Sequence, residues 1–139
     1  MAAIKGLGYL YVTSTDVDRW RELAVDCLGM QEVDGPFEGA LHLRLDERAY
    51  RVVVQPGESD NVLAIGWEVR DLAGLKEVKD ALAAAGIESR RLSFAECQDR
   101  RIEGGTAFAD PSGKPLEVFF GPRLDHSPLV NALAARFVT

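Results

Sequence analysis

A change in the spacing of apolar residues near the N-terminus predicts a strand followed by a helix. Residues 7–13 are mostly aromatic and aliphatic, which is typical of a strand. After Asp16 the apolar residues instead recur every three or four positions, so one helical face carries Val17, Trp20, Ala24, Cys27 and Leu28. Asp16 is suited to cap this helix and Gly29 to end it. Three strand-like runs follow, at residues 30–33, 40–45 and 50–55.

The same order of elements is predicted again in the second half. Residues 63–69 form a strand pattern, Asp71 is a helix cap, and Gly86 follows an amphipathic run whose buried face is Leu72, Leu75, Val78, Leu82 and Ala85. Strands are then expected at 87–92, 106–109 and 116–120. Ser93 and Glu96 have the spacing of a capping box, which adds one short helix before the 106–109 strand.

The two halves can be overlaid by counting residues. Asp16 and Asp71, which open the helices, are 71−16=55 residues apart, and Asp46 and Asp110, which open the last hairpins, are 110−46=64 apart. The difference of nine is about the length of the inserted helix. We therefore predict an α+β fold of two βαβββ modules, about 1–57 and 58–121, packed as one domain over 1–121 with a tail at 122–139.

Composition and charge exclude several classes of function. The chain has 139 residues, enough for one domain, and a formal net charge of −6, which is unsuited to binding nucleic acid. Its apolar stretches are shorter than the roughly 20 residues of a membrane-spanning helix, so we expect no membrane association and a cytoplasmic location. Cys27 and Cys97 are too few for a disulfide framework and are expected to be reduced.

Several short motifs, taken in order, resemble one family. They are Leu7-Gly8-Tyr9-Leu10, Trp20-Arg21-Glu22, Leu28-Gly29-Met30, the Phe108–Gly113 segment and the Leu116–Gly121 segment. With the doubled βαβββ pattern, they resemble the vicinal-oxygen-chelate superfamily of glyoxalases, bleomycin-resistance proteins and dioxygenases. Within it the chain is similar to the N-terminal domain of type I extradiol dioxygenases, of the 2,3-dihydroxybiphenyl 1,2-dioxygenase kind.

The resemblance implies a larger enzyme. In that family Fe(II) lies only in the C-terminal domain, where a catechol ring is opened with O2, so this chain resembles the first half and alone is expected to be inactive. Residues 136–139 resemble the segment just before the second domain. The partners implied are a second vicinal-oxygen-chelate domain or another copy of this chain, and an aromatic catechol only in the full-length enzyme.

The resemblance also identifies the positions at which metal-binding domains of the superfamily carry ligands. They fall seven residues before each helix-opening Asp, at Tyr9 and Ala64, and on the last strands, at Val53 and Glu117. Neither tyrosine nor alanine supplies the imidazole that such a site needs, and one carboxylate does not hold iron. We therefore predict no metal, no cofactor and no catalytic residue in this chain, with Tyr9, Ala64 and Glu117 as degenerate ligand positions.

Glu117 is unusual because it interrupts an apolar strand, where a buried carboxylate needs hydrogen bonds. It is either a relic ligand that binds something polar or, as we favour, a structural residue paired with an arginine such as Arg51 or with the Tyr9 hydroxyl. His42 is expected to have a packing or strand-surface role, and His126 to be exposed or at an interface.

Other residues have both a functional and a structural interpretation. Trp20, Leu23 and Trp67 suggest an aromatic platform, although core packing is the favoured interpretation. The pairs Arg90-Arg91 and Arg100-Arg101 suggest binding of a carboxylated ligand, but a solvated charged edge is favoured. Gly104-Gly105 is not followed by lysine and does not indicate a phosphate site.

Two other functions remain open. One is a metal-free small-molecule binding protein that resembles bleomycin-resistance proteins, for which the acidic charge suits a cationic ligand. The other is a glyoxalase-type isomerase, the weakest candidate because it needs the His and Glu ligands that the chain lacks at the expected positions.

Overall fold

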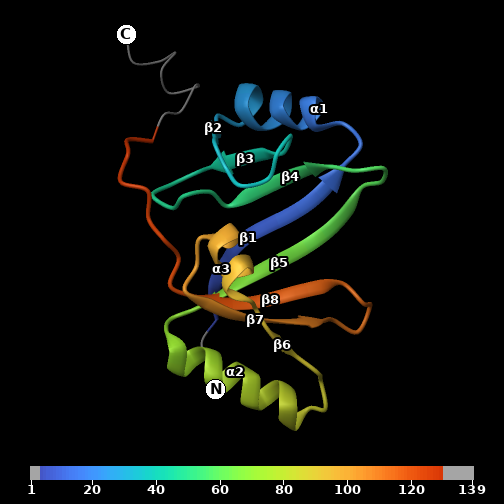
Figure 1. The fold of residues 1–139 in the computed structure, drawn as a ribbon, viewed down its shortest axis with the longest axis vertical. Helices are drawn as coiled ribbons and strands as arrows, with labels where there is room; N and C mark the ends of the chain where they lie inside the picture. The colour runs from blue at the N-terminus through green and yellow to red at the C-terminus, as the bar shows by residue number, and fades with distance from the viewer. Residues whose placement is uncertain (1–3, 130–139) are drawn as a thin grey trace. The chain divides into compact units, whose positions relative to one another are not determined.

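The computed structural model describes residues 4–129, in which the elements follow one another as the repeat predicts (Figure 1). The first half contains β1 (Ile4–Ser14), α1 (Val17–Arg21), the π-helical segment η1 (Glu22–Cys27), β2 (Gln31–Val33), β3 (Leu41–Arg44) and β4 (Val52–Pro56). The second contains β5 (Asn61–Val69), α2 (Leu72–Ala84), β6 (Arg90–Arg91), α3 (Phe94–Arg100), β7 (Gly104–Ala109) and β8 (Pro115–Phe120). The predicted α+β class with a repeated βαβββ order is confirmed, and α3 is the inserted helix.

Strand order and register repeat between the two halves. The first half has the order β2-β3-β4-β1 and the second β6-β7-β8-β5, with the first strand of each parallel to the last. Tyr11 pairs with Val53 in the first half, and Gly66 pairs with Glu117 in the second. These positions differ by 66−11=55 and 117−53=64, so the register reproduces the offsets that the sequence predicts.

Aspartates at equivalent positions perform the same local task in both repeats. The side chains of Asp16 and Asp71 cap α1 and α2 by accepting hydrogen bonds from the third amide on, at 3.0 and 2.9 Å. Asp46 and Asp110 stabilise the hairpin turns by accepting from amides two residues on, at 3.1 and 2.8 Å. The capping box at Ser93 is also present, with both of its hydrogen bonds.

The chain divides into two compact units, each with its own core. Among the described residues, one unit comprises 4–9 and 64–123, and the other comprises 10–63 and 124–129. These sets differ from the predicted modules because β1 and β5 each run from one unit into the other. Val12, Ala24, Leu41, Leu43 and Val54 form the core under α1, and Val69, Leu75 and Val118 form the core under α2.

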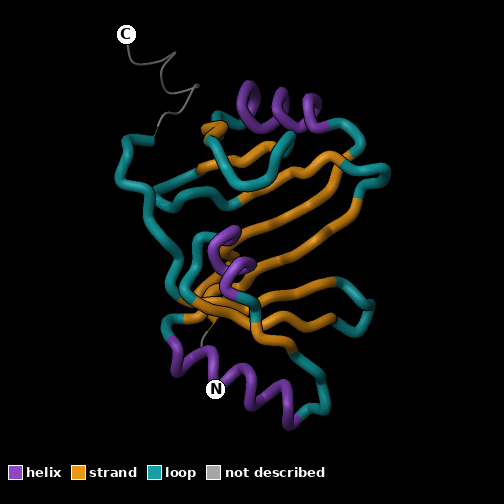
Figure 2. Tube along the Cα trace, in the orientation of Figure 1, coloured by secondary structure: helices purple, strands orange, loops and turns teal. Residues whose placement is uncertain are grey.

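The first helix differs from the prediction in its second half. Its residues continue without a break from α1 into η1, as Figure 2 shows, and the Leu28 amide bonds the Leu23 carbonyl five residues back, at 3.0 Å. A π-helical turn is wider than an α-helical turn, so residues after it move to another face. Cys27 and Leu28, which the periodicity places on the apolar face of the helix, are therefore exposed.

The predicted boundaries around α2 also need correction. The expected strand at 87–92 is reduced to Arg90–Arg91, because the Ile87 amide bonds the Leu82 carbonyl at 2.9 Å and belongs to the end of the helix. Leu72 and Ala85, at the two ends of the helix, are exposed instead of buried. None of the helices within residues 4–129 is long and apolar enough to cross a membrane.

Candidate functional site

Glu117 lies at the centre of a buried polar cluster in the unit that contains β8. Only 4% of its surface is exposed, and its neighbour Val118 packs toward α2, so the carboxylate lies on the opposite face of the strand. Arg100 donates to both carboxylate oxygens, from Nε to Oε1 at 2.6 Å and from Nη2 to Oε2 at 2.9 Å. The Tyr9 hydroxyl donates to Oε1 as well.

Tyr9 reaches Glu117 because a glycine lies beneath its ring. Gly66 pairs with Glu117 in the β5–β8 register, and a Cβ added at Gly66 would overlap the Tyr9 ring. The ring also packs against Phe119, with 4.8 Å between the ring centroids. The absence of a side chain at position 66 is thus what allows the tyrosine on β1 to hydrogen-bond a carboxylate on β8.

Arg100 is placed by the inserted helix. α3 begins at the Ser93 capping box and ends at Arg101, which adopts the left-handed conformation with φ of 56°. Arg100, in the last turn, has only 12% of its side chain exposed. The prediction of a solvated charged edge is therefore wrong for Arg100, although it holds for Arg90, which is 61% exposed.

The predicted partners of Glu117 are half correct. The Tyr9 hydroxyl is confirmed as a donor, whereas Arg51 instead pairs with Asp46, at 2.7 Å. Arg100 takes the role expected of Arg51, and no spacing in the sequence connects it with Glu117. The relic-ligand interpretation is not needed to explain the conformation of Glu117, because the carboxylate is bonded on both oxygens.

The three positions expected to be degenerate metal ligands do not make a metal site. Ala64 is fully buried on β5 and offers no donor atom, while Tyr9 and Arg100 both donate hydrogen bonds to Glu117. Across residues 4–129, no group of three His, Cys, Asp or Glu side chains could hold a metal ion. An iron site requires imidazoles as well as a carboxylate, so the residues present do not fit that ion.

The other unit has aromatic packing around its only histidine on a strand. The His42 ring stacks on Phe37 with 5.9 Å between centroids, and it meets Tyr50 edge-on at 5.1 Å. The Phe37 amide donates to His42 Nε2 at 3.5 Å, and Val53 on the neighbouring strand is fully buried. The packing role predicted for His42 is confirmed, and His126 is exposed as expected.

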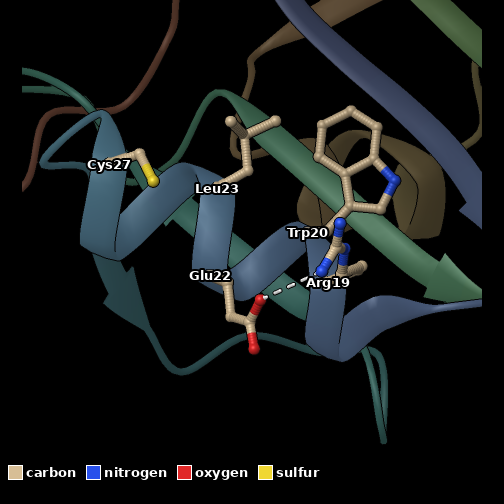
Figure 3. Close-up of a pocket in the computed structure, with 5 residues that line it drawn as sticks. All are labelled: Arg19, Trp20, Glu22, Leu23 and Cys27. Carbon is tan, nitrogen blue, oxygen red and sulfur yellow. Dashed lines mark ion pairs between the residues drawn. The ribbon is translucent and has the colours of Figure 1, made fainter.

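Two surface hollows are lined by the residues Trp20, Leu23 and Trp67, whose sequence pattern suggests an aromatic platform. One, of about 470 Å³, lies along α1 and η1 and is lined by Trp20, Leu23 and Cys27, with an Arg19–Glu22 ion pair of 3.8 Å beside them (Figure 3). Leu23 is 48% exposed, so core packing is wrong for it, whereas Trp20 is half-buried against the core under α1.

The second hollow, of about 570 Å³, lies beside α2. Its lining is entirely apolar and comprises Ile4, Trp67, Val78, Ala81, Leu82, Phe108 and Val118. Trp67 is 37% exposed there, which corrects the expectation of core packing. The lining has no acidic side chain, so this hollow does not suit the cationic ligand considered for a bleomycin-resistance-like protein.

Comparisons with known proteins give matches that extend over nearly the whole chain. A family model described as dihydroxybiphenyl dioxygenase BphC D1 matches residues 7–57. An iron-dependent extradiol dioxygenase of Rhodococcus jostii (strain RHA1) is 40% identical over 137 residues, which are 99% of this chain and 46% of that protein. The chain is a homologue of the N-terminal domain of extradiol dioxygenases.

Other matches likewise cover nearly all of this chain and less than half of the matched protein. A biphenyl-2,3-diol 1,2-dioxygenase of Sphingomonas paucimobilis is 40% identical over all of this chain and 48% of its own length. A crystal structure of a catechol 2,3-dioxygenase superposes with a TM-score of 0.88 at 36% identity, covering 94% of this chain and 44% of that one. The chain therefore spans about half the length of these relatives.

Proposed function

We propose that the chain is the non-catalytic N-terminal domain of an iron-dependent extradiol dioxygenase that opens the ring of a catechol. In this proposal iron and catechol are bound by a C-terminal domain, and the N-terminal domain supports it structurally, in the cytoplasm. The relatives act, by their names, on biphenyl-2,3-diol and 1,2-dihydroxynaphthalene, which makes a bicyclic catechol the substrate class for the whole enzyme.

The observation that carries the proposal is the bonding of Glu117. The chain aligns over nearly its whole length with an iron-dependent enzyme, yet its carboxylate at a ligand position is bonded to Arg100 and Tyr9. A guanidinium provides the positive charge that a metal ion would otherwise provide to this buried carboxylate. The repeat is thus retained while this position contributes to stability rather than to chemistry.

The proposed partner is a second vicinal-oxygen-chelate domain or another copy of this chain. The apolar hollow beside α2, which Trp67 and Leu82 help to line, supports this proposal, because an exposed apolar patch on a small domain commonly marks an interface. Burying such surface would stiffen the partner domain and contribute to assembly.

A ring-cleavage assay tests the proposal. The 139-residue chain is incubated with Fe(II), O2 and 2,3-dihydroxybiphenyl, and formation of the ring-opened product is followed by absorbance. We expect no turnover above a protein-free control, and turnover by a protein in which the same chain is followed by an iron-binding domain. Turnover by the 139-residue chain alone would contradict the proposal.

A further inference from the structure

Arg44, at the end of β3, is a buried cation that no part of the proposed function explains. Only 3% of its side chain is exposed, and the nearest carboxylate, that of Asp125, lies 3.8 Å from Nη1. Its hydrogen bonds all go to backbone carbonyls instead. Nε donates to the carbonyl of Asp46 at 2.9 Å.

The other carbonyls belong to residues 124–128, which we call the strap and which follow β8 (Figure 1, orange-red). Nη2 of Arg44 donates to the carbonyls of Asp125 and Ser127, at 3.0 and 2.8 Å, and Nη1 donates to that of Pro128 at 3.4 Å. One guanidinium therefore binds three carbonyl groups of a segment more than 80 residues away in the chain.

Backbone contacts place the strap beside the turn that follows β3. Leu124 forms a bridge with Arg48, and the Asp125 amide donates to the carbonyl of Glu47 at 2.7 Å. The Asp125 carboxylate accepts from the Ser127 amide at 2.9 Å, so the strap turns there. This turn brings its carbonyls around the Arg44 side chain.

We propose that Arg44 is the anchor that holds the strap on its unit and thereby fixes the path of the chain from Leu124 to Pro128. Its importance for a larger protein rests on the proposed function: with a catalytic domain following, the strap would be the start of the connection, and Arg44 would be a positioning residue for that domain. Nothing in the arrangement requires Arg44 to contact substrate or metal.

Arginine is suited to this task and lysine is not. The guanidinium carries five N–H donors in a rigid planar fork, and four of its hydrogen bonds are made here by three different nitrogens. A lysine ammonium has three donors on one atom and cannot span carbonyls that approach from Asp46 on one side and the strap on the other. Arg44→Lys therefore keeps the charge but loses most of the anchor.

Hydrogen exchange in the 139-residue chain tests the proposal. Amide exchange in the strap, including that of Asp125, is measured by mass spectrometry and NMR in the wild type, in Arg44→Lys and in Arg44→Met. We expect exchange in the strap to rise at least about tenfold in both variants, while the amides that pair β3 with β4 change far less. Cleavage by trypsin after Arg123 should accelerate in parallel.

Arg21→Met is the matched control, because Arg21 lies in the same unit and pairs with Asp18 and Glu32 far from the strap in sequence. It should leave strap exchange unchanged. If Arg44→Met does not fold, Arg44→Lys decides. Unchanged strap exchange in Arg44→Lys, or an increase equal to that of the whole sheet, would overturn the proposal. The two proposals are tested separately. Ring cleavage by the 139-residue chain would contradict the proposed function, whereas the exchange rates in the strap decide only the role of Arg44.

Discussion

The Tyr9 hydroxyl donates a hydrogen bond to Glu117, although the two residues are 108 positions apart. Tyr9 occupies the first-strand position, and Glu117 the last-strand position, at which metal-binding relatives are expected to carry ligands. Here one supplies a proton donor to the other, and Arg100 supplies the positive charge. The cluster has a structural role, and this has consequences for stability that can be measured.

Removing the cation should be costly. Arg100→Met leaves the buried Glu117 carboxylate with Tyr9 but without a counter-charge, and we expect a loss of about 3–5 kcal/mol in the free energy of unfolding. The double variant Arg100→Met/Glu117→Met should lose less than Arg100→Met alone, because no uncompensated charge remains. Urea denaturation measures both. Arg21→Met, at an exposed pair, is the control and should cost at most about 1 kcal/mol.

Gly66→Ala tests whether the Tyr9 ring requires the absence of a side chain at position 66 on β5. The added methyl group would overlap the ring, so either the ring or the strand must move, and we expect a loss of about 1–3 kcal/mol. Gly6→Ala on β1 is the control, since no atom lies within 4 Å of its added Cβ. Equal thermal stability of the two variants would show that Tyr9 does not require the glycine.

Glu96 predicts a dependence of stability on pH. Its hydrogen bonds from the Arg90 side chain, and then from the Ser93 amide, lower the pKa of this carboxyl from its ordinary 4.5 to about 2. A carboxyl with a lowered folded-state pKa stabilises the fold above its unfolded pKa, and that stability is lost as the pH falls from about 4.5 to about 2.

Glu96→Gln should therefore be less stable than the wild type at pH 7, by about 1–2 kcal/mol because the pair is partly solvated. The difference should shrink toward zero near pH 2. Thermal unfolding of both proteins between pH 2 and 7 measures this, and a difference that stays constant over that range would show that the Glu96 charge does not contribute.

The two thiols should react at very different rates. Cys27 is exposed beside the hollow on η1, whereas Cys97 is buried in α3, and burial raises the pKa of the Cys97 thiol. We expect a disulfide reagent to label one thiol rapidly in the folded chain and the second only after unfolding. In Cys27→Ser the rapid phase should disappear; its persistence would place the reactive thiol at Cys97.

Local sequence signals predicted most of the fold. Asp16, Asp71, Asp46 and Asp110 each bond backbone amides within a few residues, so their roles depend only on the adjacent chain. The offsets between them also match the strand register, in which Val53 and Glu117 hold equivalent positions in the two repeats. The π-helical turn at η1 was not predicted, because periodicity assumes the α-helical spacing, and it moved Cys27 out of the core.

The sequence indicates that Glu117 needs a cation or hydrogen-bond donor, but it does not indicate which residue provides it. A carboxylate between Leu116 and Val118 requires a cation or several donors, which the sequence indicates. The choice of Arg100 over Arg51 depends on where α3 places its last turn, a tertiary relationship with no sequence spacing. Arg44 was not identified at all, since its partners are backbone carbonyls, which no side-chain pattern reveals.

Binding of ferrous iron tests the central claim most directly. The 139-residue chain, and its Glu117→Gln variant, are dialysed anaerobically against Fe(II), and the iron retained per chain is determined. Because Glu117 is already bonded to Arg100 and Tyr9, both proteins should retain no more iron than a protein-free blank. One equivalent of iron bound by the wild type and lost in Glu117→Gln would contradict the account.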